Sequence, residues 1–186
     1  MVENTSAAQI LGVTETTGYD WASITVASPE IIRWNGTSFA AVPGATLSGT
    51  VRALAVFNNQ LIAAGDFTST AGPALDRVAA WDGTNWTPMN AGLPSGVVLS
   101  GTALAIHNGE LYLGGQSPFG DFPGTPRSIY RWTGSAWTVV PGSPQRPVLA
   151  LASAGGTLWA GGDFGVASGR STPYLARFDC ACYANC

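Results

Sequence analysis

The chain repeats itself at an interval in the upper forties of residues. Three segments share an apolar stretch, a turn and a second stretch that ends in glycine. These segments are residues 51–67, 103–115 and 148–164. Their matching leucines, Leu61, Leu111 and Leu158, lie 50 and 47 residues apart (111 − 61; 158 − 111). Such a period, with alternating apolar residues and regular glycine turns, is typical of a propeller or a similar array of small sheets.

The composition fits such an array. Charged residues make up only 10% of the 186 residues and apolar ones 46%, while 24 glycines and 12 prolines favour turns over long helices. No stretch approaches the roughly 20 apolar residues that a membrane helix needs, so we expect no membrane insertion. The eight Lys and Arg residues are scattered and the net charge is −3. Without a basic stripe for a phosphate backbone, nucleic acid is not expected as a partner.

Each unit is expected to form four short antiparallel strands. In the second unit the strands are expected at residues 51–57, 61–64, 77–81 and 86–89. The first two strands of each unit are joined by residues that tolerate the positive φ of a tight hairpin. These turn residues are Asn58-Asn59, Asn108-Gly109 and Gly155-Gly156. The small residues of the second strand suggest that it lies nearest a crowded central axis, and a variable polar surface loop is expected after it.

One such unit cannot bury both of its faces, so the units must stack. Three recurring tryptophans, Trp34, Trp81 and Trp132, are predicted to pack between neighbouring units, with an aromatic platform for sugar rings as the alternative. The glycines that recur at the end of the second strand are predicted to be structural. They are Gly65, Gly114, Gly115, Gly161 and Gly162.

These residues resemble the kelch-type repeat. Its order is an apolar strand ending in Gly-Gly, a variable loop, an apolar strand with Trp-Asp-Gly, and a lone Trp two or three residues on, as at residues 81–86. The galactose oxidase propeller is built from similar units. The Gly-Gly-Asp-Phe and Trp-Asp-Gly spellings are more similar to repeats of large secreted bacterial proteins and of the fungal cortical cell-polarity marker. The resemblance covers residues 31–179.

The resemblance implies a propeller of four-stranded blades used for binding or scaffolding, outside the cell or at its surface. Galactose oxidase needs histidine and tyrosine copper ligands with a thioether cross-link. His107 is the only histidine and the repeats hold no cysteine, so that chemistry is excluded and no cofactor or metal is expected.

We expect one all-β domain over residues 1–179, with units at about 1–50, 51–96, 97–146 and 147–179. Four blades are favoured, the first degenerate and the last incomplete because it stops after its third strand. The alternatives are an open fragment and a ring completed by another copy, a homo-oligomer.

The segment 180–186 is expected to begin a further C-terminal region. It holds all three cysteines, Cys180, Cys182 and Cys186, and resembles the start of a dockerin-like or sorting module. Disulfide formation is favoured over metal binding there, because structural zinc takes four ligands. No leader pattern is visible at the N-terminus, which predicts either an intracellular protein or a fragment or processed form, and the tail favours the latter.

The candidate binding residues are expected at one rim of the array. Asp66, Gln116 and Asp163 follow the last glycine of the second strand in successive units. Two rim acids would suit glycoside hydrolysis or hold a cation. The alternative, which recurrence favours, is that each Asp caps the turn by accepting backbone N–H bonds. Recurring arginines are predicted to pair with these aspartates between blades, and they are Arg33, Arg77, Arg131 and Arg177.

Other polar residues are explained by local structure. His107 adjoins a hairpin turn, so it is expected to be exposed and without a catalytic role. Turn chemistry accounts for Asn35, Asp82 and Asp179.

Three functions are compatible with this sequence. We favour a non-catalytic binding or scaffolding propeller with a protein or glycan ligand, because the polar residues repeat along with the apolar ones. The second is a carbohydrate-active enzyme using Asp66 and Asp163, which unrepeated acids such as Glu110 and Asp121 would favour. The third is a self-assembling subunit that pairs through open blade edges, because the last unit lacks a strand.

Overall fold

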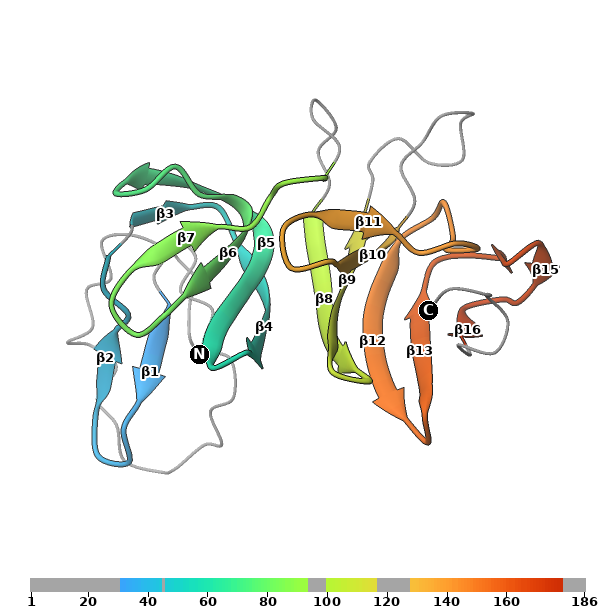
Figure 1. The fold of residues 1–186 in the computed structure, drawn as a ribbon, viewed down its shortest axis with the longest axis horizontal. Coiled ribbons are helices and arrows are strands. Elements are labelled where there is room, and N and C mark those ends of the chain that lie inside the picture. The colour runs from blue at the N-terminus through green and yellow to red at the C-terminus, as the bar shows by residue number, and fades with distance from the viewer. Residues whose placement is uncertain (1–30, 45, 94–99, 117–127, 179–186) are drawn as a thin grey trace, which may run out of the picture.

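The computed structural model describes residues 31–44, 46–93, 100–116 and 128–178, and this part of the chain is all-β without a helix. All strand pairs are antiparallel, and the sheets lie side by side in a row (Figure 1). The strands are β1 (Ile32–Trp34), β2 (Phe39–Ala41), β3 (Thr46–Ser48), β4 (Val51–Phe57), β5 (Gln60–Ala71), β6 (Asp76–Trp81), β7 (Trp86–Pro88), β8 (Ser100–His107), β9 (Glu110–Gln116), β10 (Ile129–Trp132), β11 (Trp137–Val139), β12 (Val148–Ala154), β13 (Thr157–Gly162), β14 (Val166–Ala167), β15 (Arg170–Ser171) and β16 (Leu175–Phe178).

Two of the sheets contain the predicted succession of four strands. Unit 2 pairs β4, β5, β6 and β7 in that order, and unit 3 pairs β8, β9, β10 and β11. Unit 4 contains β12, β13 and β16, and the hairpin β1–β2 is called unit 1 below. The expected bounds of β4 are confirmed.

The predicted hairpin turns are also confirmed. Asn58, Asn59 and Asn108 have φ of 48°, 61° and 50°. The turn glycines Gly109, Gly155 and Gly156 also have positive φ. In the outer hairpins the expected side chains hold the turn: Asn35 Oδ1 accepts from the N–H of Thr37, and Asp82 Oδ1 accepts from Asn85 and Thr84. The N–H of Asn85, and next that of Thr84, hold the pKa of Asp82 below its ordinary value. Asp179 lies outside the described residues.

The segments after the second strands contain strands, so the prediction of plain loops there was wrong. β5 continues to Ala71 and curls so that its far half pairs with β3, and the register shifts between Ala64 and Thr68. In unit 4 the corresponding segment forms the hairpin β14–β15. These extensions cover the phenylalanine that follows the rim aspartate, since Phe67 and Phe164 are buried. The third such loop, residues 117–127, lies outside the described residues.

The first strand of each unit, not the second, lies next to its counterpart in the neighbouring unit. β4, β8 and β12 run side by side along the middle of the row (Figure 1). The second strands lie inside their sheets, between the first and third strands. Their small residues are explained by cover on both faces: Ala63 belongs to the cluster on one side of unit 2, and Ala64 to the cluster on the other side.

The core formed by the described residues consists of three layers between neighbouring units. We call the face of a sheet toward the preceding unit its leading face and the opposite one its trailing face. The first layer joins Ile31 and Val42 of unit 1 to the leading face of unit 2. The second joins the trailing face of unit 2 to Leu111, Tyr130 and Trp137 of unit 3, and the third joins units 3 and 4.

The row has two ends. Unit 1 lies at one end and unit 4, with β16, at the other (Figure 1). Within the described residues, unit 1 consists of the two paired strands β1 and β2. The three cysteines of the segment 180–186 lie outside the described residues.

Candidate functional site

The three predicted rim residues lie at equivalent ends of three second strands. Asp66 follows the part of β5 that pairs with β4, Gln116 ends β9, and Asp163 follows β13. Each lies at the edge of its sheet that is opposite the hairpin turn between the first two strands. We call this edge, formed by these residues and the first-strand residues beside them, the bulge edge.

A bulge recurs in the first strand at this edge. The register shifts between Val51 and Ala53 in unit 2, between Gly101 and Ala103 in unit 3, and between Val148 and Ala150 in unit 4. The residues that the bulges set apart from the regular pairing are Arg52, Thr102 and Leu149. One backbone feature thus presents a different side chain in each unit.

Glycine is required at this edge because two backbone segments approach each other closely there. A Cβ on Gly65 would lie 2.0 Å from the carbonyl oxygen of Thr50, and one on Gly162 would lie 2.1 Å from that of Pro147. In both units the residue after the glycine donates its backbone N–H to that same carbonyl. Asp66 donates to Thr50 and Asp163 to Pro147, each with an N–O distance of 3.0 Å. Glycine therefore allows the second strand to touch the first where the bulge begins.

Asp66 is held by its own unit. Its Oδ1 accepts from the N–H of Thr50 at 3.1 Å, and its Oδ2 lies 3.0 Å from Nη2 of Arg52. The Nε of Arg52 donates to Oγ of Ser100 in unit 3, at 3.0 Å. This exposed chain of polar contacts joins two units at the bulge edge.

Asp163 is held in a different way. Arg146 donates through Nη2 to Oδ2 of Asp163 at 3.0 Å and through Nε to its backbone oxygen at 3.2 Å. Arg146 precedes β12, whereas Arg52 lies within β4, so the two ion pairs use non-equivalent arginines. Both pairs are well exposed, and such pairs contribute little to stability.

The predicted pairing of the rim aspartates with third-strand arginines was wrong. Arg77 forms its ion pair with its neighbour Asp76, and Arg131 forms one with Glu110. Sequence spacing misled because it does not give the register between strands. Arg131 pairs with Tyr112 and Arg177 with Trp159, nearer the hairpin end of the second strand. Arg52, by contrast, follows Val51, which pairs with Gly65 next to Asp66. The backbone N–H that donates to Asp66 likewise belongs to Thr50, directly before the first strand, and not to the following loop.

Gln116 takes the place of the aspartate in unit 3. Its side chain is exposed, and the partner strand opposite it holds Ser100. Beside it, Thr102 donates its hydroxyl to the carbonyl of Val148 in unit 4. The structure therefore brings all three predicted rim residues to one edge, each in its own unit.

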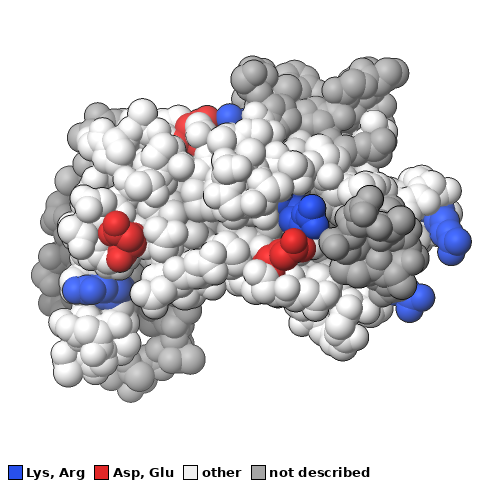
Figure 2. All heavy atoms as spheres, viewed as in Figure 1, with Lys and Arg blue, Asp and Glu red and all other residues white. Residues whose placement is uncertain are grey.

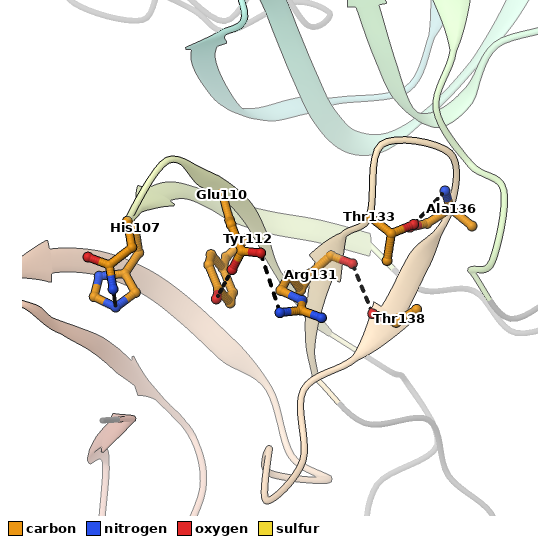
Figure 3. A network of polar contacts seen from close by, with 8 residues as sticks. His107, Glu110, Tyr112, Arg131, Thr133, Ala136 and Thr138 are labelled. Carbon is orange, nitrogen blue, oxygen red and sulfur yellow. Dashed lines mark hydrogen bonds and ion pairs between the residues drawn. The ribbon is translucent and has the colours of Figure 1, made fainter. Parts of the chain in front are cut away.

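A second polar cluster lies at the opposite edge, where units 3 and 4 meet (Figure 3). Glu110 accepts from the Tyr112 hydroxyl at 3.0 Å and from Arg131 Nη1 at 3.3 Å. His107 lies nearby, with its ring centroid 6.0 Å from that of Tyr112. Asp121, the other unrepeated acid, lies outside the described residues.

The expectation that His107 is exposed was wrong, because only 2% of it is accessible. Its Nδ1 lies 2.9 Å from Oγ of Ser153 on β12, and the side-chain amide of Asn108 lies 3.2 Å from its Nε2. The packing of β12 over the β8–β9 hairpin buries the ring, which the turn sequence alone does not reveal. His107 joins units 3 and 4.

The recurring tryptophans occupy three different environments. Trp81 packs against the layer between units 1 and 2, Trp132 against the layer between units 2 and 3, and Trp34 is 46% exposed at the end of the row. Sequence reasoning missed the more buried pair, Trp86 and Trp137. Their indole N–H groups donate to the preceding unit, at the carbonyls of Pro43 and Met89. The lone Trp after each Trp-x-Gly turn was the available signal.

Comparison with known proteins adds no assignment: neither protein-family models nor curated proteins match this chain. Among the described residues, no group of three His, Cys, Asp or Glu side chains is arranged to hold a metal ion. The described part of the chain also contains no helix of the length and hydrophobicity that crossing a bilayer requires.

Proposed function

We propose that this chain is a propeller-type domain of four-stranded blades that binds or scaffolds without catalysis, as part of a secreted or cell-surface protein. Units 2 and 3 supply the four-strand order that the kelch-type resemblance implies, and buried layers join each unit to the next. The localisation rests on the resemblance alone. The ligand is a protein or a glycan that contacts the bulge edge.

The observation that carries this proposal is the bulge that recurs with a changing side chain. The backbone is the same in three units, while the residue it presents is Arg52, Thr102 or Leu149. A fixed scaffold with varied residues at one edge is the arrangement that binding surfaces use. Charged side chains are few on the molecular face drawn in Figure 2, which favours a largely neutral ligand over a strongly charged one.

The contacts of the aspartates favour binding over hydrolysis. Asp66 is committed to Arg52 and the N–H of Thr50, and Asp163 is committed to Arg146. An acid and base pair for glycoside cleavage must face one and the same sugar bond, whereas these two aspartates lie in separate units and each is held by an arginine of its own. Gln116 stands between these two units, and its exposed amide is suited to hydrogen bonds with sugar hydroxyls or backbone groups.

The test is binding without turnover. The full chain is applied to a glycan array and to a panel of chromogenic glycosides, and Gln116→Ala is compared with Gln60→Ala, which removes the same side chain at the opposite edge of unit 2. We expect glycan binding that Gln116→Ala weakens at least about fivefold, roughly one lost hydrogen bond, while Gln60→Ala leaves it unchanged.

Hydrolysis of any glycoside that disappears in folded Asp66→Asn or Asp163→Asn would overturn the proposal in favour of the enzyme. If no glycan binds, the glycan arm is wrong, and only a protein ligand sensitive to Gln116→Ala would still support binding at this edge.

A further inference from the structure

The trailing face of unit 4 is built like those of units 2 and 3, yet it is open. The register pairs Leu175 with Gly161, as it pairs Val78 with Ala64 in unit 2 and Ile129 with Gly114 in unit 3. Val78 and Ile129 are 0% exposed, because the next unit covers them, whereas Leu175 is 57% exposed. Leu175 therefore has an apolar side chain at a position that is buried between units elsewhere, but no following unit covers it in the described part of the chain.

The first strand of unit 4 shows the same difference. Ala150 and Ala152 are exposed on β12, whereas the equivalent Ala103 and Ala105 on β8 are buried beneath unit 4. Thr102, at the bulge of unit 3, also donates to unit 4, while the equivalent Leu149 is exposed. The contacts that join each unit to its successor have no counterpart after unit 4 in the described part of the chain.

A glycine on this face points to the same conclusion. At Gly114 an added Cβ would lie 3.0 Å from Cγ1 of Val148 in unit 4, so glycine there leaves room for the next unit. At the equivalent Gly161 an added Cβ would meet only atoms of its own unit, at 3.8 Å or more. Packing within the described chain does not require a small residue at Gly161, but packing against a further unit does.

Unit 1 presents the complementary face at the other end of the row. Trp34 pairs in register with Phe39, as Trp81 pairs with Trp86 and Trp132 with Trp137. In units 2 and 3 these aromatic pairs pack against the preceding unit. In unit 1 the two rings lie 4.7 Å apart on the outer side, and Trp34 is 46% exposed.

From these two faces we infer that copies of this chain associate head to tail. The leading face of unit 1, with Trp34 and Phe39, packs on the trailing face of unit 4, with Leu175, Ala152 and Gly161, of a second copy. The contact continues the pattern of the layers inside the chain, where apolar and aromatic residues of a leading face pack on apolar residues of a trailing face.

The occupant is a second copy because the two faces lie at opposite ends of the row and do not cover each other (Figure 1). A contact between two different faces is heterologous, so it produces closed rings or open chains of copies and not a two-fold dimer through one patch. The need for two different faces distinguishes this association from nonspecific hydrophobic contact through one exposed leucine.

The test measures the mass of the full chain by sedimentation and light scattering over a wide range of concentrations. We expect a mass that rises above one chain with concentration. Leu175→Asp and Trp34→Glu each raise the dissociation constant at least about tenfold, as loss of a central apolar contact does. Val139→Asp, on the outer strand of unit 3 and 46% exposed, is the matched control and leaves association unchanged.

Mixing the two variants gives the decisive result. Leu175→Asp retains an intact leading face and Trp34→Glu an intact trailing face, so the mixture forms a species of two chains that grows no further. Ala152→Glu repeats the trailing-face test on β12 if Leu175→Asp does not fold. A wild-type chain that stays monomeric throughout overturns the proposal, as does association that Leu175→Asp abolishes and Trp34→Glu leaves intact.

Discussion

At the scale of single residues, a buried hydroxyl stands out. Tyr130 lies in the layer between units 2 and 3 and is 1% exposed, and its hydroxyl has no hydrogen-bond partner in the described structure. Burial raises the pKa of Tyr130 to about 12, with the charge of Arg77 acting in the opposite direction. An unsatisfied buried hydroxyl costs free energy, which makes this residue a place where stability can be gained.

We predict that Tyr130→Phe raises the free energy of unfolding at pH 7 by about 1–2 kcal/mol, because phenylalanine fills the same space without a polar atom to desolvate. The variant also removes the part of the loss of stability at alkaline pH that comes from ionisation of Tyr130. Tyrosine in the unfolded chain titrates near 10 and Tyr130 in the fold at about 12. Its contribution is therefore complete below pH 10 and is lost as the pH rises through 12.

Urea unfolding at pH 7, 9 and 11 measures both effects, with Tyr174→Phe, at an exposed tyrosine, as the control that changes little at pH 7. A loss of stability in Tyr130→Phe would mean that the hydroxyl is hydrogen-bonded in solution, by a buried water.

At the scale of the strand, the two glycines that end β13 do different work. A Cβ on Gly162 would lie 2.1 Å from the backbone oxygen of Pro147 and 2.9 Å from Cα of Val148, and backbone atoms cannot turn aside. On Gly161 it would stay at 3.8 Å or more from its neighbours. Two adjacent glycines thus allow a test of the bulge with the same substitution.

We predict that Gly162→Ala lowers the free energy of unfolding by about 2 kcal/mol or more, because the bulge must open to admit the methyl group. Gly161→Ala stays within about 0.5 kcal/mol of the wild type. Thermal and urea unfolding at low protein concentration, where association does not contribute, measures both. Equal effects of the two substitutions would show that the bulge does not depend on glycine.

The strands and their turns show which features can be predicted from sequence and which cannot. Asn58 and Asn59 predict their turn because positive φ is a local demand, and the bounds of β4 follow from alternation within the strand. The partner of Asp66 was not predictable, because the bulge at Arg52 depends on pairing between strands and leaves no local signature. The burial of His107 depends on unit 4, and the deeper burial of Trp137 than of Trp132 depends on where unit 2 covers their common face, since the Trp137 indole donates to the carbonyl of Met89.

At the scale of the molecule, the units differ in how much cover they have. Unit 3 is covered on both faces, by the layers shared with units 2 and 4, whereas unit 4 shares only one layer within the described part of the chain. In a row of units, stability is the sum of each unit's own stability and its interfaces with neighbours. Unit 4 is therefore expected to open more readily than unit 3, and a second copy on its trailing face would supply the absent interface.

Hydrogen exchange tests this ordering directly. We predict that the amides of β9 (Glu110–Gln116) exchange at least about tenfold more slowly than those of the equivalent β13 (Thr157–Gly162) in dilute protein, because local opening costs more where both faces are covered. Peptide-resolved mass spectrometry measures both strands in one sample. Raising the protein concentration should slow exchange in β13 and leave β9 unchanged, since unit 4 gains a neighbour and unit 3 does not, and Leu175→Asp should cancel that slowing. Equal rates in β9 and β13 at every concentration would instead mean that all units open together in one cooperative step. Unit 4 would then be no less stable than unit 3, and a second copy would not be needed to stabilise it.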